Sequence, residues 1–154
     1  CPTAEVIATL NLAWDYATAK AAMEDILANY PQIDGILSQG GAMTQAAIDA
    51  YVEQGLPLVP MTGEASNGFL RVWLEQADNG LQSMAFCNPT WISDTALDTA
   101  IRILNGEEVE KEITVTVPPV TLETAKDLYR PDVNDSFWVH TYLSDAEIKE
   151  LFPK

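Results

Sequence analysis

The sequence is poor in basic residues. Eight Lys and Arg against 23 Asp and Glu in 154 residues give a formal net charge of −15. Binding to nucleic-acid phosphates or anionic lipids depends on positive charge, so neither is expected as a partner. No apolar run approaches the ~18 residues of a membrane span, and the first residues lack the basic start and apolar stretch of a signal peptide. We expect no membrane span and no targeting signal in this chain.

Cysteine and histidine are scarce as well. The two cysteines, Cys1 and Cys87, are too few and too far apart for a disulfide framework or a zinc site. The single histidine, His140, has no nucleophile or orienting partner that the sequence identifies. The phosphate-binding patterns G-x-x-x-x-G-K-[ST] and G-x-G-x-x-G are absent, and Ser66 is misplaced for a G-x-S-x-G elbow. We therefore expect no catalytic residues, no metal and no cofactor.

The sequence contains two apolar patterns that alternate regularly, one typical of strands and one typical of helices. Apolar runs of strand length recur, and each of the first four is followed by apolar residues at helical spacing. This order predicts βαβ units, and hence an α/β fold with a doubly wound parallel sheet up to about residue 117. The expected strands are 5–10, 33–38, 57–62, 81–86 and 112–117, and the expected helices are 14–30, 42–54, a third around 69–74 and 92–104.

The composition changes after residue 117. Residues 118–154 begin with two prolines and are rich in aspartate and aromatics without a sustained period. Aromatic side chains are uncommon in disordered segments, so we expect an ordered tail packed over residues 1–117. Ser144 and Glu147 have the spacing of a capping box, which predicts a short final helix through Leu151.

Function in such a fold is expected in the loops that follow the strands, because ligands bind at the carboxyl ends of parallel strands. Amides and carboxylates in these loops can bind hydroxyl groups, and an indole can cover the apolar face of a sugar ring. Trp14 has an alternative role, in which it packs the start of its helix onto the core. The loop residues with these side chains are Asn11, Trp14, Asp15, Gln39, Glu64, Asn67, Asn88 and Trp91.

An ordered series of motifs resembles the second lobe of the type I periplasmic sugar-binding proteins of ABC importers. The series starts with ATLNLAWDYATAKAAMEDILANYPQIDGILSQGGAMTQAAIDAYVEQGL and continues with PLVPMTGEASNG, LQSMAFCNPTW and KEITVTVPPVTLET. SFWVHTYLSDAEIKELF resembles the tail of a sugar-importer subgroup. The resemblance implies a two-lobed protein, periplasmic or extracellular, that binds a monosaccharide or similar polar ligand, works with a membrane permease and is not an enzyme.

The resemblance also assigns site residues. Trp14 takes the place of the aromatic residue that stacks on the sugar, Gln39 and Gly40 match the polar turn, and Glu64 lies at or beside an acidic ligand contact. Cys87 and Asn88 match the first hinge crossing. Two departures leave the ligand open, including a non-sugar ligand. The family's usual Asn-Asp in the turn is Gly40-Gly41 here, and its usual hinge glutamine is Cys87.

The resemblance further implies that this chain is a C-terminal fragment, with the first lobe upstream. Residues 88–112 would then cross toward that lobe, and we expect a homodimer through residues 88–117 to cover the apolar stripe of the 92–104 helix. Lipid attachment at Cys1 is an alternative account of the N-terminus. Two other functions stay open: the effector-sensing domain of a sugar-responsive transcription regulator, and a small α/β enzyme.

Overall fold

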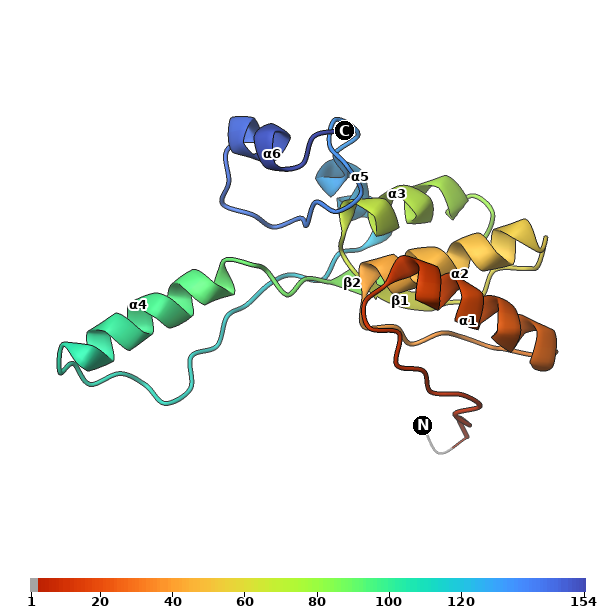
Figure 1. Ribbon diagram of the computed structural model, residues 1–154, viewed down its shortest axis with the longest axis horizontal. Coiled ribbons are helices and arrows are strands. Elements are labelled where there is room, and N and C mark those ends of the chain that lie inside the picture. Colours follow the sequence, from red (N-terminus) through yellow and green to blue (C-terminus); the bar gives the residue numbers. More distant parts are fainter. Residues whose placement is uncertain (1–2) are drawn as a thin grey trace.

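Two short parallel strands form the centre of the fold (Figure 1). The computed structural model describes residues 3–154, so Cys1, the candidate lipid-attachment residue, lies outside the described part. Strand β1 (Met61–Glu64) pairs with β2 (Ser83–Phe86) in register Met61 to Ser83, and Ile36 extends the sheet by a parallel bridge to Met61. The parallel pairing with intervening helices confirms the predicted α/β class.

Three helices pack beside one another on the same side of the strands (Figure 1). They are α1 (Tyr16–Asn29), α2 (Gly41–Glu53) and α3 (Asn67–Gln76). Side-chain oxygens of Asp15 and Ser66 cap α1 and α3, respectively. Met61, Gly63 and Ala85 are buried, whereas their strand neighbours Thr62, Glu64, Met84 and Phe86 are half-buried or exposed. Within the described residues the helices therefore cover one face of the sheet.

Two of the expected strands are wrong, and two others are reduced or displaced: 33–38 contributes only the bridge at Ile36, and 57–62 overlaps β1 only at Met61 and Thr62. Residues 5–10 form no strand ladder, and their apolar side chains are exposed, with Val6 79% accessible. Residues 112–117 also form no strand, and the chain returns to the sheet at Val120, which pairs antiparallel with Ala85. A strand requires a neighbouring backbone for its hydrogen bonds, and apolar alternation alone does not supply one.

Helix α4 (Ile92–Leu104) belongs to an arm that projects away from the three packed helices (Figure 1). None of its residues is buried. The chain leaves the sheet after β2, forms α4 and comes back along residues 109–115, which line an open groove with the helix. The predicted apolar stripe thus does not fold back onto the lobe's own sheet.

The C-terminal tail is ordered, as predicted. It contains α5 (Leu122–Leu128), which the sequence pattern did not reveal, and α6 (Asp145–Leu151), whose capping box of Ser144 and Glu147 is present. Buried apolar side chains of the tail, including Val120, Phe137 and Ile148, join the same core as Phe69 and Trp73 of α3. Among the described helices, none combines the length and hydropathy that a membrane crossing demands.

Candidate ligand-binding site

A cavity of about 480 Å³ lies at the carboxyl ends of β1 and β2, next to the starts of α1 and α2. This is the edge of a parallel sheet at which ligands bind. Five of the residues predicted for a site line it together. They are Trp14, Gln39, Glu64, Cys87 and Asn88, and the lining is completed by Leu37, Ser38, Thr62, Gly63 and Phe86.

Trp14 is presented to the cavity by a tight turn. The turn is closed by the Asp15 N–H, which donates to the Leu12 carbonyl at 3.0 Å. Its two central residues, Ala13 and Trp14, have φ values of 51° and 60°, in the left-handed region. This conformation costs non-glycine residues about 1 to 2 kcal/mol each, and such strain is concentrated at functional sites. The indole is 60% exposed, so core packing does not account for its position.

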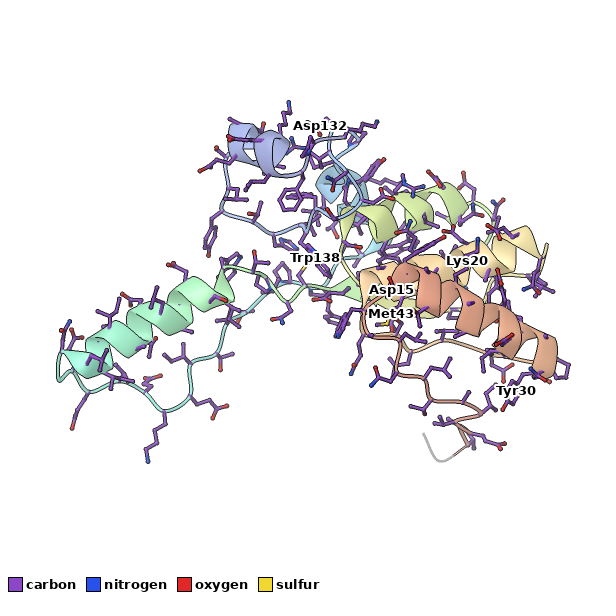
Figure 2. The ribbon with its side chains drawn as sticks, viewed as in Figure 1. Asp15, Lys20, Tyr30, Met43, Asp132 and Trp138 are labelled. Atoms are coloured by element: carbon purple, nitrogen blue, oxygen red, sulfur yellow. The ribbon has the colours of Figure 1, made fainter. Side chains whose placement is uncertain are left out.

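Asn11 and Asp15 support this turn and are not among the residues that line the cavity. The Asn11 side chain accepts a hydrogen bond from Ala13 N at 3.4 Å. Asp15 Oδ1 accepts from Thr18 N at 2.8 Å and from the Thr18 hydroxyl at 2.6 Å, and these bonds hold the pKa of Asp15 below its usual value. Asp15 is the N-cap residue at the start of α1 (Figure 2).

Asn67 is not among the residues that line the cavity. The residue is 1% exposed, and its side chain forms hydrogen bonds with the tail. Oδ1 accepts from Arg130 N at 2.9 Å, and Nδ2 donates to the Arg130 carbonyl at 2.8 Å. Nδ2 also lies 3.4 and 3.2 Å from the carbonyls of Val133 and Asn134. The amide therefore joins α3 to the tail.

Glu64 is the one charged side chain among the residues that line the cavity. Burial raises its pKa above the usual 4.5, and a hydrogen bond from the Asn88 backbone acts against this rise. Cys87 Sγ donates to the Val139 carbonyl at 3.7 Å. Burial, and then the nearby Glu64 charge, raise the pKa of the Cys87 thiol to about 11. The thiol is accordingly a protonated, weakly nucleophilic group at neutral pH.

Some polar side chains around the cavity are hydrogen-bonded to other groups of the lobe, and others could bind a ligand. The Thr62 hydroxyl accepts from Ser38 N at 3.0 Å and donates to the Ser38 carbonyl at 3.1 Å, and the Ser38 hydroxyl donates to the Gly40 carbonyl at 3.2 Å. These bonds fix the turn before α2. For the side-chain amides of Gln39 and Asn88, the described residues provide no hydrogen-bond partner. Gln39, Asn88 and Glu64 are thus the groups that can bind a polar ligand.

Trp91 lies outside the cavity lining, at the root of the α4 arm. Its Nε1 donates to the His140 carbonyl at 2.9 Å, and its ring stacks on Tyr142 with centroids 4.8 Å apart. His140 itself has a left-handed φ of 60°. These contacts connect the arm to the tail, so Trp91 and His140 hold the position of the arm and do not line the cavity.

The prediction missed five lining residues, and a simple signal could have found most of them. Leu37, Ser38, Thr62 and Phe86 are the last or next-to-last residues of the expected strands, and Gly63 follows directly. These residues lie one or two positions before the predicted site residues Gln39, Glu64 and Cys87. Within residues 3–154 no group of three or more His, Cys, Asp or Glu side chains could hold a metal ion.

An α/β lobe with a cavity at the carboxyl ends of its strands, lined by an indole, free amides and one carboxylate, defines a class of small-molecule binding domains. Residues 1–108 match the family model described as the periplasmic binding protein domain, and the chain belongs to this family. The fold is the type I periplasmic binding protein fold. Comparison with curated proteins gives no match.

Several solved structures share the fold. An ABC transporter periplasmic solute binding protein from Actinobacillus succinogenes 130z with bound D-allose has a TM-score of 0.61 at 22% identity over 80% of this chain and 43% of its own. A Mycobacterium smegmatis protein in complex with β-D-fucofuranose has a TM-score of 0.67 at 20% identity over 82% of this chain and 41% of its own. The periplasmic binding protein component of the arabinose ABC transporter from Shewanella sp. ANA-3 has a TM-score of 0.66 at 20% identity over 82% of this chain and 43% of its own. The chain spans less than half the length of each.

Proposed function

We propose that this chain is one lobe of a two-lobed solute-binding protein of an ABC importer, and that it binds a neutral monosaccharide or a similar polyol. The observation that carries the proposal is the cavity in which Trp14 lies with Gln39, Glu64 and Asn88 at the carboxyl ends of the strands. An indole can cover the C–H face of a sugar ring while amides and a carboxylate bind its hydroxyls.

The charge of the cavity supports an uncharged ligand. Its lining includes one carboxylate and no cationic side chain. An acidic sugar or a sugar phosphate would place like charges together in a partly buried site, which is unfavourable. The sugars named with similar structures, D-allose, β-D-fucofuranose and arabinofuranose, are neutral. The protein would bind its ligand and not transform it, because the thiol and the carboxylate of the cavity lack a base or acid arranged for catalysis.

The arm supports the two-lobe part of the proposal. Residues 88–117 lie outside the sheet, to which the chain returns at Val120, and α4 has no buried residue. In the proposed protein, this arm packs against the other lobe, and the ligand is enclosed between the lobes. Residues 118–154 then form the crossover and tail. In the isolated chain the same face would be covered by a second copy, which makes a homodimer the expected state.

The location and the transport partner follow from the same proposal. The protein would act outside the cytoplasm and deliver its ligand to a membrane permease, and a lipid anchor stays a prediction. No observation favours an effector-sensing domain of a transcription regulator.

A thermal-shift panel on the two-lobed protein tests the proposed function. We expect one or more of D-allose, D-fucose, L-arabinose and D-fructose to raise the unfolding temperature with a dose dependence, because a ligand that binds only the folded state stabilises it. D-Glucuronate and D-ribose 5-phosphate serve as charged controls and should produce no shift. Stabilisation by the charged compounds alone would contradict the proposal of a neutral ligand.

A further inference from the structure

The space around Gly40 leaves no room for a side chain. Gly40 precedes α2 with φ of −130° and ψ of 136°, an extended conformation that any residue can adopt. The backbone therefore does not require glycine here. A Cβ built on Gly40, however, would lie 2.7 Å from Trp14 Cε3 and 2.9 Å from Trp14 Cζ3, distances that real Cβ atoms do not reach. The indole occupies the volume that a side chain would take.

We propose that Gly40 is the positioning residue for Trp14: its missing side chain lets the indole lie against the start of α2, at the edge of the ligand cavity. The proposal rests on the proposed function for its effect on binding, but the placement of the indole is a property of the chain alone. Any side chain at this position would displace the ring, and the ligand would lose the surface on which it stacks.

The neighbouring contacts indicate which group would move. The Cβ would also lie 2.7 Å from Met43 Cε, but this is the far end of a flexible side chain that can turn away. Trp14 is 60% exposed as a residue, so its ring can shift toward solvent. Neither neighbour is backbone, so a substitution at Gly40 should change the position of the indole and not the fold.

Gly41 provides the contrast. A Cβ at Gly41 would meet the Glu64 carbonyl and the Ser66 side chain, and both are held by the β1–α3 connection. A backbone carbonyl cannot turn aside as an exposed ring can. The two adjacent glycines thus have different functions: Gly41 allows α2 to pack against the sheet edge, and Gly40 admits the indole. A Gly41→Ala variant should lower the unfolding temperature strongly, whereas Gly40→Ala should lower it only by the small cost of replacing an N-cap glycine with alanine.

The test uses the two-lobed protein labelled with 5-fluorotryptophan and observed by 19F NMR. The chain contributes four tryptophans, and Trp14→Phe assigns the Trp14 resonance. We expect Gly40→Ala to move the Trp14 resonance and leave that of buried Trp73 in place. Gly35→Ala is the matched control, because its Cβ would meet one atom at an ordinary 3.4 Å, and it should move neither. An unmoved Trp14 resonance in Gly40→Ala would overturn the proposal, whether or not any sugar binds.

Affinity supplies the second readout, by calorimetry with the sugar that gives the largest thermal shift. Gly40→Ala should weaken binding about 10-fold or more, and should have no further effect in a Trp14→Ala background, because the two changes act through one ring. Additive losses would contradict the proposal. If Gly40→Ala does not fold, folding of Gly40→Ala/Trp14→Ala would support it, and failure of the double variant would refute it. A protein that binds none of the sugars while its Trp14 resonance moves would refute the proposed function and support the positioning role.

Discussion

Glu64 connects the stability of the lobe to its proposed ligand. It is a half-buried carboxylate in the cavity, and burial raises its pKa above 4.5. A carboxyl group with a raised pKa in the folded state favours folding at low pH, and this contribution is lost as the pH rises through the folded-state pKa. At neutral pH the ionised group therefore opposes folding.

Replacing Glu64 by Gln should raise the midpoint of urea unfolding at pH 7, and the gain over wild type should disappear as the pH falls toward 4.5. The same change should weaken sugar binding, since a charged acceptor is lost. Glu24→Gln, on the exposed surface of α1, is the control and should change neither property. A Glu64→Gln variant that is less stable than wild type at pH 7 would show that the carboxylate is satisfied within the lobe.

Cys87 gives a second prediction at the scale of one residue. Its thiol pKa of about 11 predicts that alkylation by iodoacetamide is slow at neutral pH and that the rate still increases past pH 9, the ordinary thiol value. The Cys87 peptide can be followed by mass spectrometry, which separates it from Cys1. A rate that reaches its plateau at or below pH 9 would mean that the thiol is not shielded by burial and by Glu64.

At the scale of elements, Asn67 tests how the tail is attached to α3. Asn67→Ala should lower the free energy of unfolding by about 1 to 3 kcal/mol, because it leaves the half-buried Arg130 N–H and the Val133 carbonyl without their partner, while the carbonyls of Arg130 and Asn134 keep a backbone N–H donor. Urea unfolding measures the loss, and hydrogen exchange should show faster exchange in residues 129–139. Asn79→Ala, in the exposed turn that follows α3, is the matched control. If Asn67→Ala weakens sugar binding without loss of stability, Asn67 is a ligand residue after all.

The helices were predictable from the sequence because apolar spacing and caps are local. The expected helices 14–30 and 42–54 match α1 and α2 within two residues. Helix α5 was missed because its capping pair is Thr121 with Thr124, which lacks the Glu or Gln of the usual pattern. The strands at 5–10 and 112–117 failed because a strand depends on a partner that lies far away in sequence.

The site was predictable to the extent that it follows strand ends. Gln39, Glu64, Cys87 and Asn88 stand one or two residues after expected strands, Trp14 is the first residue of an expected helix, and the sheet brings the five together. Asn67 has the same loop position, but its partners lie 63 to 67 residues away in the tail. No local pattern could assign its amide to them.

At the scale of the whole molecule, the arm is the feature that a single copy leaves incomplete. Leu97, Ile101 and Leu104 of α4 are 61%, 48% and 85% exposed. Burying such side chains stabilises by about 1.5 to 3 kcal/mol each, so the arm is expected to find a partner. We propose that the other lobe covers the arm in the two-lobed protein, and that a second copy covers it in the isolated chain.

Light scattering tests this expectation on the isolated chain. The wild-type chain should have the mass of a dimer, and Leu97→Glu/Ile101→Glu should have that of a monomer with an unchanged helix signal in circular dichroism. Asp98→Lys, which changes the charge of the same helix at another exposed position, should remain dimeric. A wild-type monomer at the concentrations used for crystallisation would exclude the dimer.

The measurement that tests the central claim most directly is calorimetric titration of the two-lobed protein with the sugar panel, on wild type, Trp14→Ala and Tyr30→Ala. Tyr30 follows the last residue of α1, about 20 Å from its start, and is the matched aromatic control (Figure 2). We predict that wild type and Tyr30→Ala bind the same sugar equally, and that Trp14→Ala loses about 2 kcal/mol, or about 30-fold in affinity. Equal affinity in Trp14→Ala and wild type would contradict the assignment of this cavity as the sugar site.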